Sequence, residues 1–231
     1  EYILNQLRFR IQNKNLRLGP SHIEIETLKL PPIEVYIEYF DSYSNACELL
    51  EIEPLFKRGL GSPEQFFGSS KKFEDTEIFI DTREQKPLEF PRSRDMKLDF
   101  GDYTVGGDDY AYTYVDRKSE ADFKSTLSTG LERFKRELDR AREFDSYLYI
   151  VTESDIAKIK KNNIFGPHKS NLEYVFHNLR VLSHEYADTC QFMFTSNRSN
   201  STNIIPKLLV GGRKLWNVDF QYYIDHYLHP T

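Results

Sequence analysis

Five side chains whose types suit phosphate chemistry stand at or just beyond the ends of predicted strands: Asp81, Glu84, Asp102, Asp116 and Lys118. Side chains two positions apart in a strand point to the same face, so Asp116 and Lys118 should face together while Arg117 faces the opposite way. Carboxylate oxygens are the ligands that Mg²⁺ and Mn²⁺ prefer, and a neighbouring lysine can orient a water or stabilise charge on a phosphate. The set therefore predicts metal-dependent hydrolysis of phosphodiester bonds.

Four of these residues also have an ordinary structural interpretation. Asp81 could cap a turn with Arg83 as its partner, and Asp102 belongs to a Gly-Asp pair that is common in turns. Asp116 and Lys118 could be an exposed pair on an edge strand. Taken singly the residues stay ambiguous, and only their combination favours a catalytic site.

Predicted strands and helices alternate through the part of the chain that carries these residues. Apolar runs predict strands over 77–80, 110–115, 147–151 and 191–195, and helical spacing predicts helices after Ser119 and over 156–161, 171–186, 202–209 and 219–228. Gly130 should interrupt the first of these helices. Such alternation predicts an α/β fold with a central mixed sheet flanked by helices.

The first 70 residues show a different pattern. Residues 7–11 and 23–26 alternate between apolar and polar side chains, and 35–40 form an apolar-rich run, so we expect a small β-rich module of unknown role over 1–70. The Gly- and Ser-rich stretches 59–63 and 68–72 have linker composition. The expected domains are therefore 1–70 and 77–231.

Composition sets limits on the class of protein. Of 231 residues, 39% are hydrophobic, which suits a globular chain, and no apolar run approaches the roughly 18 residues of a membrane span, so no membrane partner is expected. The net charge of −5 argues against nucleic-acid binding, but clustered catalytic carboxylates lower this total while basic strips can lie elsewhere. The chain opens at Glu1 and its first methionine is Met96, so we expect an excerpt or a processed product.

The cysteines and histidines give no metal spacing. Cys47 and Cys190 are too far apart for a cysteine zinc site and give no disulfide framework, although a single disulfide stays open. This pattern fits a reducing intracellular compartment, the nucleus or the cytoplasm. The six histidines are scattered, which argues against a histidine metal centre.

Three ordered motifs resemble those of a known family. Residues 80–84 (Ile-Asp-Thr-Arg-Glu), 101–103 (Gly-Asp-Tyr) and 116–122 (Asp-Arg-Lys-Ser-Glu-Ala-Asp) are similar to the pattern of XPF-type nucleases, which belong to the restriction-endonuclease-like fold. Residues 132–138 resemble the basic helix that follows the motif in phage and bacterial members. The resemblance covers about 77–153 well, the C-terminal helices loosely and 1–70 not at all.

The resemblance implies roles for particular residues. Asp81, Asp102 and Asp116 would be metal ligands, Glu84 a ligand or the support of one, and Lys118 catalytic. The supporting residues would be Arg83, Arg117 and Asp122, and the DNA contacts Arg133, Arg136 and Lys169. Position 116 departs from the family, which usually has glutamate there, so the shorter carboxylate must reach farther or the strand must lie closer to the metal.

The activity implied is a Mg²⁺- or Mn²⁺-dependent DNA endonuclease acting on branched or junction DNA, as in DNA repair and recombination. The chain has no room for the tandem helix-hairpin-helix domain with which dimeric eukaryotic members grip DNA, so a homodimer or a partner subunit would grip DNA by other means. One alternative is a catalytically inactive DNA-binding or scaffolding subunit, and another is a nuclease that acts on RNA or without specificity. Arg133 and Arg136 could equally pair with Glu137 and Glu132 on a solvated helix face.

Overall fold

The computed structural model describes residues 1–56, 75–107, 110–166 and 169–228, and the chain divides into two compact units. Unit 1 comprises residues 1–60 together with 217–231, and unit 2 comprises 61–216. This division differs from the expected one because the C-terminal segment groups with unit 1. The predicted linker stretches 59–63 and 68–72 lie outside the described residues.

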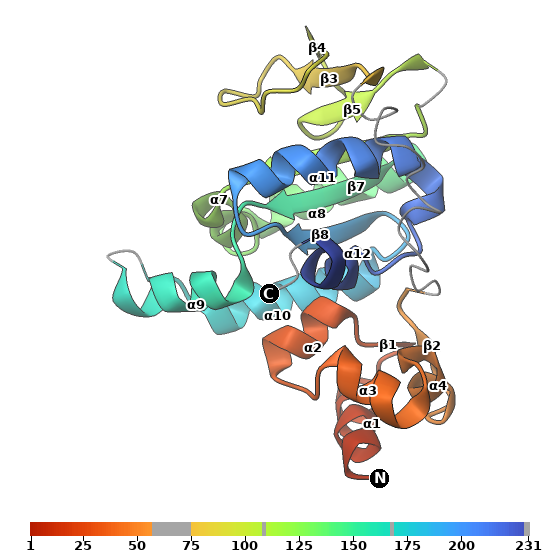
Figure 1. The fold of residues 1–231 in the computed structure, drawn as a ribbon. Coiled ribbons are helices and arrows are strands. Elements are labelled where there is room, and N and C mark those ends of the chain that lie inside the picture. The colour runs from red at the N-terminus through yellow and green to blue at the C-terminus, as the bar shows by residue number, and fades with distance from the viewer. Residues whose placement is uncertain (57–74, 108–109, 167–168, 229–231) are drawn as a thin grey trace. The chain divides into compact units, whose positions relative to one another are not determined.

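Unit 2 contains a six-stranded mixed sheet with the strand order β4-β3-β5-β6-β7-β8 (Figure 1). The strands are β3 (Ile78–Asp81), β4 (Ser93–Met96), β5 (Tyr103–Val105), β6 (Thr113–Lys118), β7 (Tyr147–Thr152) and β8 (Cys190–Phe194). β5 runs antiparallel to β3 and to β6, and the other neighbours are parallel. All six residues of β7 are buried, as expected for a strand covered on both faces.

Helices cover both faces of this sheet. They are α7 (Glu120–Thr126), α8 (Leu131–Glu143), α9 (Ile156–Phe165), α10 (Leu172–Glu185) and α11 (Arg198–Gly211). On one face Phe134 of α8 packs against Phe192, with ring centroids 6.2 Å apart. On the other, Trp216 follows α11, stacks on Tyr147 at 4.9 Å and donates its indole N–H to Thr113. The predicted α/β architecture with a central mixed sheet is confirmed.

The predicted β-rich character of residues 1–70 is wrong. The described part of this segment forms α1 (Tyr2–Lys14), α2 (His22–Leu28), α3 (Ile33–Phe40) and α4 (Tyr43–Glu48), with only the two-residue strands β1 (Leu18–Gly19) and β2 (Glu53–Pro54). Two helical signals outweigh the short alternations. Ile3, Leu7 and Ile11 recur at steps of four and join the core of the unit, and the hydroxyl of Ser21 caps α2 by accepting the N–H of Glu24.

The C-terminal segment completes unit 1 with α12 (Phe220–Tyr223) and a π-helical turn, η3 (Ile224–Leu228). His22 at the start of α2 donates its backbone N–H to Asp219 at 2.8 Å, and its Nε2 lies 2.9 Å from Asp225. His226 contacts Glu34 of α3. No helix among the described residues is long and apolar enough to cross a membrane.

Candidate active site

The ends of β3 and β6 are joined through the segment that carries Asp102. The backbone N–H of Asp81 donates to the carbonyl of Asp102 at 2.8 Å, and the N–H of Asp102 donates to the carbonyl of Val115 at 2.7 Å. Gly101 makes this approach with a φ of +56°, and a Cβ there would lie 2.6 Å from the Val115 oxygen. Only glycine therefore fits the turn that brings Asp102 beside β6.

Asp116 and Lys118 project from β6 as an ion pair, and Arg117 points to the opposite face, as predicted. Lys118 Nζ lies 2.7 Å from Asp116 Oδ2 and 3.0 Å from Oδ1, and both side chains are mostly buried. The ammonium also lies 5.5 Å from the ring centroid of Phe134. Burial lowers the pKa of Lys118, but Asp116 and the other facing carboxylates outweigh it and raise the pKa, so the lysine is held charged.

Among the carboxylates of the cluster, Asp102 has the pKa that is shifted furthest from its ordinary value. Burial, and then the nearby charges of Asp116 and Glu84, raise its pKa to about 7, against the opposing hydrogen bond that its Oδ2 accepts from the Arg117 backbone N–H at 2.7 Å. No hydrogen bond from the described residues reaches its Oδ1. The site thus has an excess of negative charge that Lys118 alone does not neutralise.

A further carboxylate, Glu137 of α8, belongs to this cluster. Burial and the charge of Asp116 raise its pKa, while Lys118 and Arg133 oppose the shift. The sequence suggested only an exposed pair with Arg133 for Glu137. Its position directly before the buried Leu138 was the available signal, because a residue there lies at the border of the buried helical face.

Asp81 has a different environment. Its Oδ1 accepts the backbone N–H and the Nε–H of Arg83, both at 2.7 Å, and its Oδ2 accepts the guanidinium of Arg83 and the backbone N–H of Leu98, both at 2.8 Å. These contacts, the arginine foremost, lower the pKa of Asp81 to about 2 although burial opposes them. A carboxylate offers about four lone pairs and all four are engaged, so Asp81 has none left for a metal ion in this arrangement.

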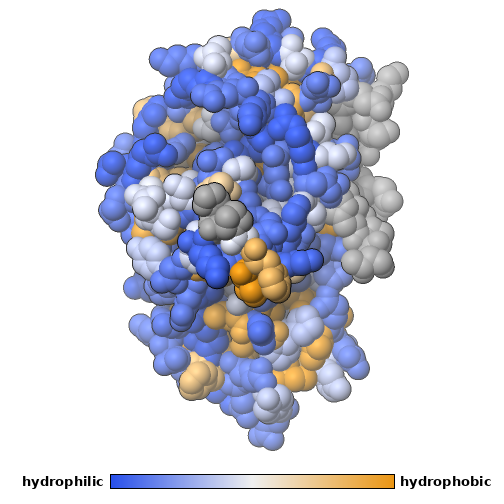
Figure 2. Space-filling view, turned by 90° about the vertical axis from the view of Figure 1, so that its left-hand side faces the viewer, coloured by the Kyte–Doolittle hydropathy of each residue, from blue (hydrophilic) through white to orange (hydrophobic). Residues whose placement is uncertain are grey.

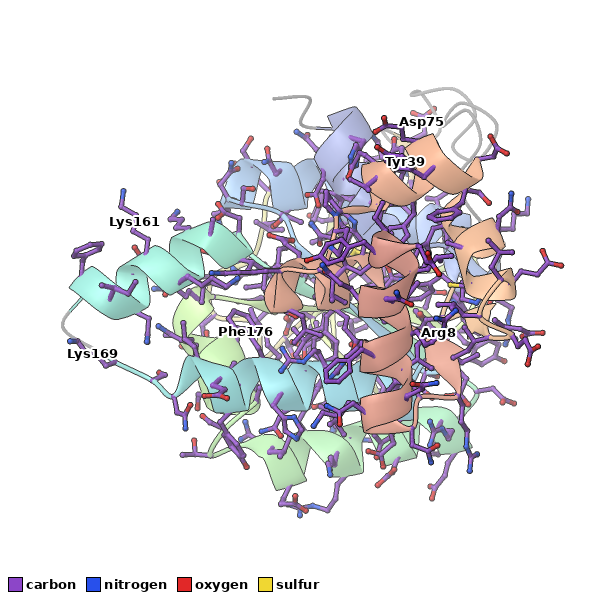
Figure 3. All side chains as sticks on the ribbon, turned by 90° about the horizontal axis from the view of Figure 1, so that it is seen from below. Arg8, Tyr39, Asp75, Lys161, Lys169 and Phe176 are labelled. Carbon is purple, nitrogen blue, oxygen red and sulfur yellow. The ribbon has the colours of Figure 1, made fainter. Side chains whose placement is uncertain are left out.

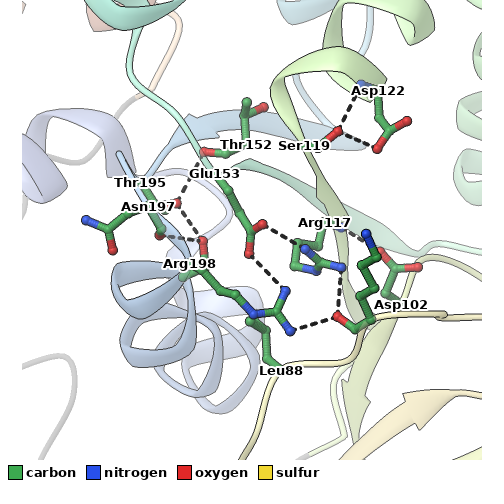
Figure 4. A network of polar contacts seen from close by, with 12 residues as sticks. Leu88, Asp102, Arg117, Ser119, Asp122, Thr152, Glu153, Thr195, Asn197 and Arg198 are labelled. Atoms are coloured by element: carbon green, nitrogen blue, oxygen red, sulfur yellow. Dashed lines mark hydrogen bonds and ion pairs between the residues drawn. The ribbon is translucent and has the colours of Figure 1, made fainter.

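Two arginines contact the segment that begins at Glu84, and Figure 4 shows both of them beside Glu153. Arg117 donates to Glu84 Oε1 at 3.1 Å, to the carbonyl of Lys86 at 3.0 Å and to Glu153 Oε2 at 2.8 Å. Arg198, the first residue of α11, donates to the carbonyl of Lys86 at 2.8 Å and to that of the next residue at 2.5 Å, and it lies 3.7 Å from Glu153. Glu153 and Arg198 follow β7 and β8, and no spacing in the sequence relates them to the motifs.

The remaining predicted residues lie outside the cluster. Asp122 is exposed and accepts from Ser119, whose hydroxyl in turn caps α7, so its contacts are those of a helix start. Arg133, Arg136 and Lys169 are exposed, as phosphate contacts would have to be, and no contact of the described residues tests that role.

The types of the donor atoms suit a hard divalent cation, since Asp102, Asp116 and Glu84 present oxygen atoms alone. In this arrangement their ligand atoms do not all lie within 4.8 Å of one another, and among the described residues only His22, Glu26 and Asp225 of unit 1 meet that condition. Burial first, and then the charges of Asp116 and Glu84, raise the pKa of Asp102, and a nearby cation would oppose this shift. Asp81 does not fit this role, and its contacts point instead to positioning Arg83.

Comparison with known proteins adds little to this description. No family model and no curated protein matches the chain. Among solved structures, XPF from Aeropyrum pernix in complex with DNA matches with 19% sequence identity and a TM-score of 0.44, over 58% of this chain and 63% of that one. Another structure of XPF from Aeropyrum pernix matches with 20% identity and the same TM-score, over 58% and 59%. The match thus spans about three-fifths of the length of these structures. A functional assignment therefore has to rest on the side chains of the site.

Proposed function

We propose that unit 2 is a metal-dependent DNA endonuclease of the XPF type that cuts branched or junction DNA. The observation that carries this activity is the meeting of Asp102, Asp116 and Lys118 at neighbouring strand ends, with a pKa of about 7 on Asp102. Two of the three ordered motifs that resemble the XPF-type pattern contain these residues: 101–103 contains Asp102, and 116–122 contains Asp116 and Lys118.

Asp102 and Asp116, with Glu84 beside them, would hold Mg²⁺ or Mn²⁺. When bound, such an ion supplies a more acidic water and neutralises charge on the scissile phosphate. Lys118, kept protonated by its carboxylate neighbours, donates a hydrogen bond to a phosphate oxygen or to the attacking water. Arg117 donates to Glu84 through its guanidinium and fixes Asp102 through its backbone N–H.

A nicking assay tests this activity. The purified chain is incubated with labelled fork, flap, Holliday-junction and linear duplex DNA in Mg²⁺, Mn²⁺ or EDTA. We expect cutting that needs the metal and falls by about 10²-fold or more in Lys118→Met and in Asp102→Asn. Asp95→Asn, which changes an exposed carboxylate on β4, is the matched control and should leave the rate unchanged.

Binding without cutting would point to the alternative, a catalytically inactive DNA-binding subunit. The decisive pattern would be equal affinity for junction DNA in the wild type and in Lys118→Met, with no product in any metal. Faster cutting of RNA than of DNA would instead reassign the substrate.

A further inference from the structure

The end of α9 presents two large apolar side chains to solvent. Phe165 is 81% exposed and Ile164 is 63% exposed, and within the described residues no other large hydrophobic side chain is as exposed as Phe165. Figure 2, seen from the side toward which α9 points in Figure 1, shows an apolar patch bordered by hydrophilic surface. We call Ile164 and Phe165 the α9 tip. Leaving such groups in water forgoes the stabilisation of burial, which suggests that they have a binding role.

The tip is held firmly by the residues just before it. Asn162 donates to Glu120 of α7 at 2.8 Å. Asn163 makes two hydrogen bonds with the backbone of Ser170, donating to its carbonyl at 3.0 Å and accepting its N–H at 2.8 Å. These contacts fix the described residues on both sides of the tip, so a ligand would meet Ile164 and Phe165 on a preformed surface.

A cleft of about 660 Å³ extends between α7 and the end of α9. Glu120 and Lys124 line one wall, the hydroxyls of Ser125 and Ser128 continue it, and Asn162 lines the other. Glu120 stands two residues after Lys118, and Gly166, which also borders the cleft, directly follows Phe165. The cleft therefore joins chain segments that adjoin the candidate active site and the tip.

Exposed lysines surround the tip. Lys158 and Lys161 precede Phe165 by seven and four positions and so share its face of α9, and both are exposed. Lys169 is exposed on the segment that returns from the tip, and Figure 3 shows Lys161 and Lys169 at this end of the helix. An aromatic ring among cations matches nucleic acid, whose bases stack on the ring while its phosphates meet the ammonium groups.

We propose that the α9 tip stacks on the terminal base pair where duplex DNA gives way to single strand, and that the cleft between α7 and α9 receives the unpaired strand. Lys161 and Lys169 contact the phosphates on either side. This assignment rests on the proposed nuclease function. It would explain a preference for branched DNA, since continuous duplex exposes no terminal base pair to the ring of Phe165.

The test uses the full chain in EDTA, so that binding is measured without cutting. Forked DNA carries 2-aminopurine in the first base pair next to the branch, and a closed circular duplex, which has no terminal base pair, carries it at one pair. Phe165→Ala should weaken fork binding by about tenfold and remove the fluorescence change of the fork, because one stacking contact is lost. Affinity for the circular duplex should change less than about twofold, and Phe165→Trp should keep both fork signals.

Phe9→Ala is the matched control, since Phe9 is also an exposed phenylalanine, at 69%, but lies on α1. Equal fork affinity in Phe165→Ala, Phe9→Ala and the wild type would overturn the assignment while leaving a nuclease that cuts in Mg²⁺ intact. Loss of a wild-type dimer in Phe165→Ala, seen by light scattering, would overturn it in favour of a contact with a second copy. A wild type that neither binds nor cuts any DNA would remove the proposed function itself.

Discussion

Replacing Asp102 by asparagine should make the metal-free protein more stable at alkaline pH. The folded protein raises the pKa of this carboxyl from 3.8 to about 7, so between these values the folded state keeps a proton that the unfolded chain has lost. The stability of the folded state therefore falls as the pH rises through this range, and the destabilisation by the ionised Asp102 carboxylate is complete above about pH 7. Asparagine removes the charge and can still accept the Arg117 N–H.

The size of this effect follows from the pKa difference. One pKa step corresponds to about 1.4 kcal/mol, so the raised pKa sets an upper limit of about 4 kcal/mol. Partial solvent access reduces the expected gain to about 2 kcal/mol, which in a domain of this size raises the melting temperature by roughly 4–8 °C.

Trp216 allows this unfolding to be followed in unit 2 alone. It is the single tryptophan of the chain and stacks on Tyr147, so its fluorescence reports the unit that contains the site. In EDTA at about pH 8 we expect Asp102→Asn to melt above the wild type, and near pH 4 the two curves should converge. Added Mg²⁺ should raise the melting temperature of the wild type more than that of the variant. Asp95→Asn serves as control, and a variant that melts at or below the wild type at pH 8 would refute the electrostatic reasoning.

Three further predictions concern substitutions that should weaken stability, metal binding or turnover. Asp81→Asn should destabilise unit 2 by about 1–3 kcal/mol in urea unfolding followed by Trp216 fluorescence at pH 7, because Arg83 loses its charged partner. Since the pKa of Asp81 is lowered to about 2, the greater stability of the wild type should persist to pH 4 and shrink only as the pH falls toward 2. An unchanged unfolding midpoint at pH 7 would contradict this reasoning. Glu137→Gln should raise the Mg²⁺ concentration for half-maximal cutting about fivefold, since it removes a negative charge near Asp116, and an unchanged metal titration would exclude Glu137 from the site. Arg198→Met should lower the turnover rate about tenfold with a stability loss below about 1 kcal/mol, because the carbonyl of Pro87 loses its donor and that of Lys86 keeps only Arg117. Arg198→Lys should restore turnover poorly, whereas a purely structural role would change stability and leave turnover unchanged.

The strand ends of unit 2 could be predicted because their cause is local. The buried run before Asp81, the alternation through Asp116 and Lys118 and the cap at Ser119 each depend on neighbours within a few residues. For this reason the pairing of Asp116 with Lys118 followed directly from the period of a strand.

The sequence does not indicate which residues far apart in the chain contact one another. The pairing of Asp81 with Arg83 is among the structural alternatives that the sequence offers, but nothing near Asp81 indicates that the Leu98 N–H, 17 positions away, occupies the rest of its carboxylate. The link from Arg198 to Lys86 joins residues 112 positions apart. In residues 1–56 the short alternations predict strands, but the helical repeat of Ile3, Leu7 and Ile11 extends over a longer stretch than any one alternation and packs into the core of the unit.

The discontinuous make-up of unit 1 has a consequence for the order of events at the ribosome. Its N-terminal helices emerge before unit 2, yet Asp219, Asp225 and Tyr222, which contact them, are synthesised only after unit 2. Unit 2 lies wholly between these two pieces and can fold as soon as residue 216 has left the exit tunnel. The candidate active site would then assemble while α1–α4 still lack their final partner, and during that interval the nascent chain would expose the apolar side chains of its first helices to chaperones.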